Sequence, residues 1–179
     1  IIIDNYAFEG CSSLTSVTLP NSVRLPNSVT GMGNYAFYNC SSLKSITIPD
    51  GVTTIGSHMF DGCSSLTSIV MPNSVTNIGD YAFSGCSSLK SITIPGRVTS
   101  IGDNAFNKCK NLTSIILSDG LTSIGRSAFS GCSSLKSITI PDGVTSIGTY
   151  AFSSCKNLTS IILSDGLTSI ETGTFDGCS

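Results

Sequence analysis

The chain has 179 residues, of which 40% are apolar and only 11% are charged. Its formal net charge of −2 gives no electrostatic basis for binding nucleic acid or anionic lipid. No apolar run approaches the roughly 18–20 residues that a membrane-spanning helix needs. The composition is therefore that of one folded domain with enough apolar residues to fill a core.

Two residue types recur in one register from the first residues to the last. After a first interval of 29 residues, the cysteines are spaced by 23, and every phenylalanine lies three residues before a cysteine. The cysteines are Cys11, Cys40, Cys63, Cys86, Cys109, Cys132, Cys155 and Cys178, and the phenylalanines are Phe8, Phe37, Phe60, Phe83, Phe106, Phe129, Phe152 and Phe175. A fixed period in the twenties is typical of a stacked-repeat protein.

The longer first interval has a readable origin. Residues 19–23 read Leu-Pro-Asn-Ser-Val, and the same five residues return at 25–29. We interpret residues 24–29 as a six-residue insertion that loops out at the edge of the stack. Residues 1–179 then form a single solenoid of about seven to eight 23-residue repeats. Because the chain opens inside a repeat and stops where the next strand should begin, we expect it to be part of a longer protein.

One unit, residues 40–62, shows how each repeat is built. The spacing of Leu43, Ile46 and Ile48 ends in the alternation of a half-buried strand. Turn residues 49–51 (Pro-Asp-Gly) then stop the strand, and Val52 and Ile55 bring the chain back toward the core. Phe60 and Cys63, three residues apart, share one face of a short helical turn.

A single unit cannot bury its own apolar residues, so each 23-residue coil must stack on its neighbours. Stacked strands about 4.8 Å apart form a parallel sheet along one side. Coils that are wider on the opposite side would bend the stack and make the sheet concave.

The unit L-x-x-I-x-I-P-x-x-V-x-x-I-G-x-x-A-F-x-x-C resembles the Treponema pallidum-type leucine-rich repeats of BspA-like proteins, over nearly the whole chain. Departures from it are few: Met59 and Thr174 replace Ala, Ser118 and Ser164 replace Pro, and Glu171 replaces Gly. The resemblance implies a right-handed leucine-rich-repeat superhelix, with a parallel β-sheet on the concave face and short helical turns or irregular structure on the convex face. It also implies an extracellular or cell-surface protein that binds host matrix proteins or other cells.

Because side chains alternate along a strand, the residues between the buried positions should face outward and stack into rows. One row is all serine, its neighbour is mostly β-branched, and a third alternates Thr with Lys. The predicted ligand-binding residues are Ser45, Ser68, Ser91, Ser114, Ser137 and Ser160; Thr47, Val70, Thr93, Ile116, Thr139 and Ile162; and Lys44, Lys90 and Lys136. The competing interpretation is that Ser and Thr only solvate this face. Repeat proteins do bind ligands on extended concave surfaces, but this face has no aromatic or Arg anchors, so we expect weak binding per site.

The chain presents no candidate catalytic, cofactor or metal site. We expect the cysteines to be free buried thiols, because one cysteine per coil points the same way as its neighbours and does not present paired Cβ vectors. No C-x-x-C spacing and no second histidine accompany His58, which takes a position held by Tyr35, Tyr81 or Tyr150 in other repeats. We therefore predict a non-enzymatic protein without cofactors.

One acidic row leaves an alternative open. Asp119, Asp142 and Asp165 occupy the same turn position on three consecutive coils, where stacked carboxylates could attract Ca²⁺. The structural interpretation is that Asp before Gly is an ordinary turn residue.

Three functions remain in competition. The first is a binding or adhesion module that presents its Ser/Thr-rich concave face to a protein or glycan ligand. The second is a structural spacer or filament that self-associates end to end through uncapped terminal repeats. The third is ice binding through Ser-x-Thr rows, which a curved face interrupted by Lys, Val and Ile fits poorly.

Overall fold

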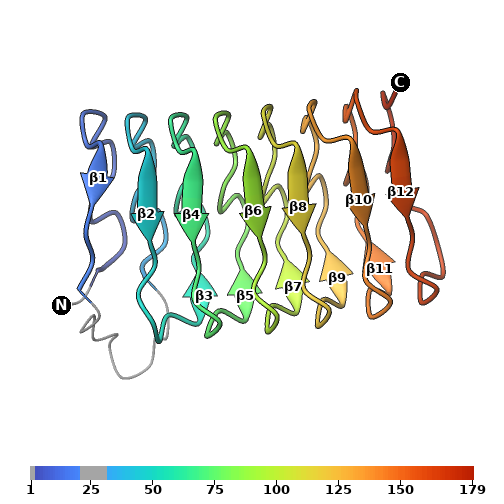
Figure 1. The fold of residues 1–179 in the computed structure, drawn as a ribbon, viewed down its shortest axis with the longest axis horizontal. Helices are drawn as coiled ribbons and strands as arrows, with labels where there is room; N and C mark the ends of the chain where they lie inside the picture. The colour runs from blue at the N-terminus through green and yellow to red at the C-terminus, as the bar shows by residue number, and fades with distance from the viewer. Residues whose placement is uncertain (1–2, 21–31) are drawn as a thin grey trace.

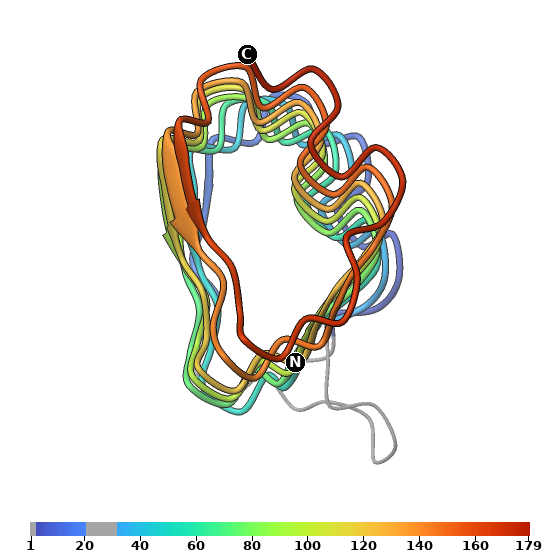
Figure 2. The ribbon, with the colours of Figure 1, turned by 90° about the vertical axis from the view of Figure 1, so that its right-hand side faces the viewer.

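The chain coils into a solenoid of parallel strands, as a computed structural model of residues 3–20 and 32–179 describes. Each coil advances along one axis, so that the coils lie side by side in Figure 1 and superpose when viewed down the axis in Figure 2. The predicted stacked-repeat architecture with a parallel sheet is confirmed. The predicted hand and concavity stay predictions, and the insertion predicted at residues 24–29 lies outside the described residues.

A row of short strands, one per coil, forms the front of the molecule in Figure 1. The side chain at the centre of each strand points into the core, and its two neighbours point outward in the pattern expected from alternation. The strands of this row are β1 (Ser16–Val17), β2 (Ser45–Thr47), β4 (Ser68–Val70), β6 (Ser91–Thr93), β8 (Ser114–Ile116), β10 (Ser137–Thr139) and β12 (Ser160–Ile162).

A second parallel sheet, absent from the expectations above, lies where Ile55 and its equivalents bring the chain back toward the core. Its five strands have two residues each, with the isoleucine buried. They pair in the order β11-β9-β7-β5-β3. The strands are β3 (Thr54–Ile55), β5 (Asn77–Ile78), β7 (Ser100–Ile101), β9 (Ser123–Ile124) and β11 (Ser146–Ile147).

The remaining side of each coil is a run of consecutive turns, here called the turn ribbon (residues 4–11, 33–40, 56–63, 79–86, 102–109, 125–132, 148–155 and 171–178). Hydrogen bonds alternate along it: the Cys63 amide donates to the Phe60 carbonyl in the same coil, whereas the Phe60 amide donates to the Ala82 carbonyl of the next coil. This alternation ties each coil to its neighbour at every second residue. The described residues contain no helix, so this side is built of turns. The described part of the chain accordingly has no helix long and apolar enough to cross a membrane.

The corner glycine at the start of the turn ribbon is required by the closeness of the coils. A Cβ at Gly125 would lie 2.6 Å from the Asp103 amide nitrogen, which is too close for any side chain to replace hydrogen. The glycine therefore allows the backbones of neighbouring coils to approach at the corner.

The core is one continuous cluster along the axis. The eight Phe rings stack with centroids 5.0–5.7 Å apart and nearly parallel planes. The six central phenylalanines are fully buried, together with most of the Leu, Ile and Cys positions of the repeat. The burial predicted for the cysteines is confirmed from Cys40 to Cys155, but it is wrong for Cys11, which is exposed, and holds only in part for Cys178; neither of these two coils has a described coil stacked on both of its sides.

Candidate functional site

The outward side chains of β1, β2, β4, β6, β8, β10 and β12, with the Thr/Lys row before them, form one surface that we call the strand face. All fifteen predicted ligand-binding residues are exposed on it. Parallel pairing places equivalent residues side by side, for example Ser45 beside Ser68 and Thr47 beside Val70. Val70, Ile116 and Ile162 have 60%, 64% and 61% of their surface exposed, so an apolar residue stands out on every second coil.

The strand face is not one continuous sheet. Hydrogen bonds join β1 to β2 and β2 to β4 in a first sheet, β6 to β8 in a second, and β10 to β12 in a third. No hydrogen bonds of the ladder join β4 to β6 or β8 to β10. Figure 1 shows a wider spacing at the same two places. Four strands therefore present an edge whose backbone groups have no partner in the facing strand.

The alternation of Thr with Lys follows the pairing of the strands at every junction except that of β1 with β2. The Thr67 amide and hydroxyl both donate to the Lys44 carbonyl, the hydroxyl at 3.0 Å, and Thr113 does the same to Lys90. Lysine has no hydroxyl to donate, so β6 and β10 lack this second bond to the coil before them. β1 and β2 are joined by backbone bonds alone, which shows that the hydroxyl reinforces the pairing and is not required for it.

Each interruption of the sheet opens a groove of about 350 Å³. Groove A, between β4 and β6, includes Ser68, Val70 and Thr93 in its walls, and groove B, between β8 and β10, includes Ser114, Ile116 and Thr139. Every residue lining groove B is 46 positions after one lining groove A. Residues 109–124 and 155–170 are identical at the same 46-residue interval, so the sequence shows this longer period but does not show the grooves.

The grooves combine apolar walls with polar groups and carry little charge. Their walls hold serine and threonine hydroxyls, the exposed Val70 or Ile116, and in groove B one carboxylate, Asp119. The Cα atoms of the strands flanking each groove still approach within 8 Å, less than the roughly 9.6 Å that an inserted strand would require. A groove can therefore take a side chain or a sugar ring, with hydrogen bonds to hydroxyls and to unpaired backbone groups.

The cysteines are free throughout the described residues, with six of them buried, Cys178 partly buried and Cys11 exposed. Each thiol from Cys40 onward donates to the Phe carbonyl of the preceding coil, as Cys63 does to Phe37 at 3.1 Å. Burial raises the pKa of Cys40 to about 11 and that of Cys155 to about 12, so these thiols stay protonated. Nucleophilic chemistry requires the thiolate and has no basis at these positions.

Metal-ligating side chains do not gather into a group of three or more in the part of the chain that the structure describes. Asp119, Asp142 and Asp165 are exposed on separate turns. His58 Nδ1 lies 2.9 Å from the Asp61 carboxylate, and the His58 ring stacks between two tyrosine rings. The position of the single histidine is therefore explained by its packing.

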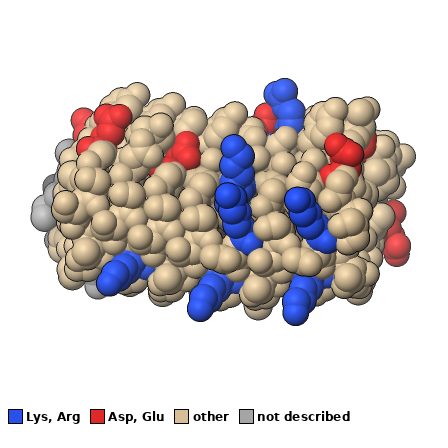
Figure 3. Space-filling view, turned by 90° about the horizontal axis from the view of Figure 1, so that it is seen from above, with Lys and Arg blue, Asp and Glu red and all other residues tan. Residues whose placement is uncertain are grey.

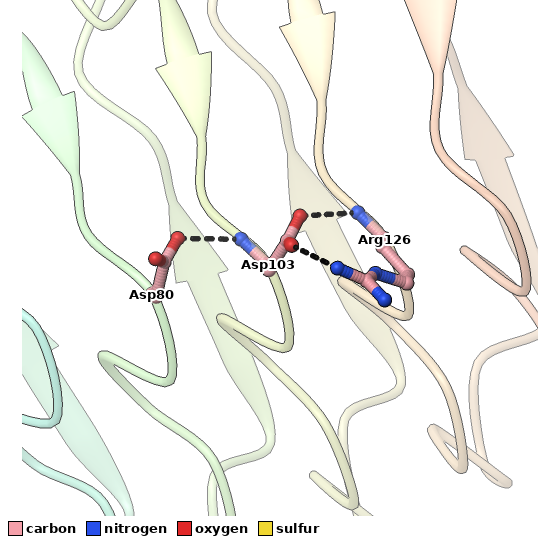
Figure 4. A network of polar contacts seen from close by, with 3 residues as sticks. All are labelled: Asp80, Asp103 and Arg126. Carbon is pink, nitrogen blue, oxygen red and sulfur yellow. Dashed lines mark hydrogen bonds and ion pairs between the residues drawn. The ribbon is translucent and has the colours of Figure 1, made fainter.

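A ladder of side-chain oxygens caps successive coils at the start of the turn ribbon (Figure 4). The Asp80 carboxylate accepts the Asp103 amide at 2.8 Å, and the Asp103 carboxylate accepts the Arg126 amide at 2.7 Å. Arg126 also forms an exposed ion pair with Asp103 at 3.4 Å. Asn5 and Asn34 accept amides in the same way on earlier coils, so this position needs an oxygen and not a charge.

Residues 1–110 and 99–179 match the BspA type Leucine rich repeat region, in six copies. The chain belongs to this family. A search among curated proteins finds no match.

Solved structures of this BspA-type chain's relatives share its fold. A leucine-rich repeat protein from Bacteroides ovatus is 39% identical with a TM-score of 0.84, and the alignment covers 92% of this chain and 42% of that one. The T. pallidum leucine rich repeat protein is 34% identical with a TM-score of 0.81, covering 92% of this chain and 75% of that one. A leucine rich cell surface protein from Faecalibacterium prausnitzii is 28% identical with a TM-score of 0.57, covering 98% and 62%. The first two are described as leucine-rich repeat proteins, and the third as a leucine rich cell surface protein.

Proposed function

We propose that this BspA-type solenoid is a non-enzymatic binding or adhesion module whose strand face contacts a protein or glycan ligand. The observation that carries the proposal is the pair of equivalent grooves A and B, which the chain builds twice from residues 46 positions apart. Val70 at groove A and Ile116 at groove B are both exposed. If the outward residues served only to solvate the sheet, exposed apolar side chains at these two positions would not be expected.

We further propose that the protein acts at the cell surface or outside the cell. Support comes from the family and from the Faecalibacterium prausnitzii relative, which is described as a leucine rich cell surface protein.

The composition of the strand face determines the kind of affinity to expect. Tight interfaces depend on a few aromatic or Arg anchors, and the outward rows of the described strands contain neither. Each groove is small and neutral to weakly charged, so a single contact should be weak. A ligand with a repeating structure would engage both grooves at once and gain affinity from the second contact.

The test is a binding screen of the whole chain against immobilised matrix proteins and glycans, followed by single substitutions. Thr139→Lys places a long cation at the wall of groove B, and we expect it to weaken binding of a captured ligand by about tenfold, the effect of losing roughly 1.4 kcal/mol. Thr145→Lys is the matched control, because Thr145 is also exposed but lies six residues further on, outside the strand face. Surface plasmon resonance would measure both variants.

A comparison of the Thr139→Lys and Thr145→Lys variants tests whether the ligand binds to the strand face. Weaker binding by Thr139→Lys alone supports the strand face. Equal binding by both variants would show that the ligand uses another surface, and equal loss would show a general effect of added charge.

A further inference from the structure

A second row of aromatic side chains lies on the turn ribbon, across the coil from the strand face. Tyr6, Tyr35, His58 and Tyr81 hold the same position on four consecutive coils, with ring centroids 4.9, 4.5 and 4.5 Å apart and nearly parallel planes. Tyr38 stands edge-on to Tyr35 at 5.6 Å. Unlike the buried Phe stack, this one reaches solvent, since Tyr6 and Tyr81 at its two ends are 52% and 37% exposed.

The backbone at this position does not favour aromatic residues. All four residues have φ between 55° and 61°, in the left-handed region where a side chain other than Gly or Asn costs roughly 1–2 kcal/mol. The four later coils hold Asn104, Ser127, Tyr150 and Gly173 at the same place, so a coil can stack there with or without an aromatic ring. The fold therefore does not require rings here, yet the first four coils carry them in succession.

Acidic side chains lie close in sequence to the rings of this stack, and basic ones do not. Asp4, Glu9, Asp61 and Asp80 all lie within three residues of a stacked ring, and the Asp61 carboxylate contacts the His58 ring at 2.9 Å. Among the described residues before position 90, Lys44 is the sole cation, and it lies on the strand face. Figure 3 shows acidic side chains without basic ones over the upper left of the molecule, above the first coils.

We propose that these rings and carboxylates, here called the acidic aromatic patch, bind an arginine-rich segment of a partner protein. A guanidinium group stacks flat on an aromatic face and at the same time pairs with a carboxylate, which is the combination the patch offers. Tyr81, at one end of the stack, is 37% exposed and directly follows Asp80 in the chain. One oxygen of the exposed Asp80 carboxylate accepts the Asp103 amide, and the other can pair with a guanidinium group. The patch is separate from the strand face and does not depend on the function proposed for it.

The experiment uses a fluorescently labelled hexa-arginine peptide as the probe, titrated with the whole chain by fluorescence anisotropy at pH 8 and low salt. A hexa-glutamate peptide serves as the charge control. Tyr81→Asn removes one ring and installs the residue that Asn104 already provides at the same φ, so the fold is retained. Asp80→Asn removes a charge but keeps the oxygen that caps the next coil, as Asn34 does.

Tyr150→Asn is the matched control, because Tyr150 has the same backbone conformation but neighbours Ser127 and Gly173 instead of rings. We expect Tyr81→Asn and Asp80→Asn each to weaken hexa-arginine binding by about fivefold, and Tyr150→Asn to change it by less than about twofold. Thermal melting of each variant verifies that folding is unaffected.

Three outcomes would overturn the proposal. In the first, the wild type shows no saturable binding of hexa-arginine. In the second, Asp80→Asn weakens binding while Tyr81→Asn does not, which would show that the peptide is attracted by charge alone and does not stack on the ring. In the third, Tyr150→Asn loses as much affinity as Tyr81→Asn, which places the arginine contacts elsewhere.

Discussion

Single positions in the repeat show how a substitution is accommodated by new hydrogen bonds. Ser164 stands where other coils have Pro, and its hydroxyl lies 2.9 and 2.8 Å from the carbonyls of Asp142 and Val144. It also accepts the Gly166 amide at 3.0 Å. Pro stiffens the turn by restricting φ, whereas Ser reaches a similar end by bonding the turn to the coil before it.

The buried thiols give the chain a stability that depends on pH. A thiol in the unfolded chain ionises near pH 9, whereas burial raises the folded pKa of Cys40 to about 11 and that of Cys155 to about 12. Above pH 9 the folded state therefore binds more protons than the unfolded state, so stability is full below pH 9 and is lost as pH rises toward 11–12. We expect a loss of up to about 1.4 kcal/mol per pH unit for each buried thiol.

Urea unfolding at pH 8, 9 and 10 in the presence of a reductant would measure this slope. Cys155→Ala should make it shallower by removing one buried thiol. Cys11→Ala, at the exposed cysteine, should leave it unchanged. A slope that is the same in all three proteins would contradict a role for burial.

At the scale of elements, the strand face is a set of pairs with an unpaired edge between them. The bond from the Thr67 hydroxyl to the Lys44 carbonyl has no equivalent at Lys90, where the sheet opens into groove A. Whether Thr or Lys precedes a strand thus sets how many hydrogen bonds can join it to the coil before it on this face.

Lys90→Thr should close groove A, because the new hydroxyl can donate to the Thr67 carbonyl as Thr67 does to Lys44. The β6 amides that face β4 are then expected to exchange with solvent at least about fivefold more slowly, the effect of roughly 1 kcal/mol of added local stability. Hydrogen exchange followed by NMR would measure this. Lys44→Thr is the control, because β1 and β2 are already paired there, and slowing at the β4–β6 junction in that variant would count against the mechanism.

Much of this fold could be predicted from the 23-residue period. The alternation around Ile46 predicted which side chains face outward, and the Phe and Cys registers predicted the core. The second sheet could not be predicted, since two-residue strands such as Thr54–Ile55 are too short for alternation to show. Grooves A and B arise where neighbouring strands are not hydrogen-bonded to each other. The repeat period could not predict them, because the coils have nearly the same sequence whether or not their strands are bonded.

The aromatic patch was missed for a different reason. The tyrosine positions are visible in the sequence, where His58 reads as a tolerated replacement in a tyrosine position. Whether rings at successive coils stack depends on a left-handed backbone that arises from consecutive turns. The sequence predicted short helical turns or irregular structure for that side, and residues in a short helical turn would not have positive φ.

The whole molecule is a one-dimensional stack in which each coil contacts only its neighbours. The Phe rings run through all eight coils and are the largest buried side chains of the core. Cooperative unfolding therefore depends on every interface between coils being intact.

Phe106→Ala, in the middle of the stack, should cost about 3–5 kcal/mol and divide unfolding into two transitions, because a cavity there uncouples the two halves. Urea unfolding followed by circular dichroism would show this as a broadened or biphasic curve. Phe175→Ala, in the partly buried last ring, should cost less and leave the transition single. A single sharp transition in Phe106→Ala would mean that the halves stay coupled without the ring.

The 46-residue interval between grooves A and B constrains how such a chain can change in length. Losing one 23-residue unit, such as the one that contains Thr113, would bring Lys90 and Lys136 onto adjacent strands, where like charges repel. Losing two units restores the original alternation. We therefore expect a chain that gains or loses two units to keep the spacing of its lysines, and the number of grooves to change by one with each such pair of units.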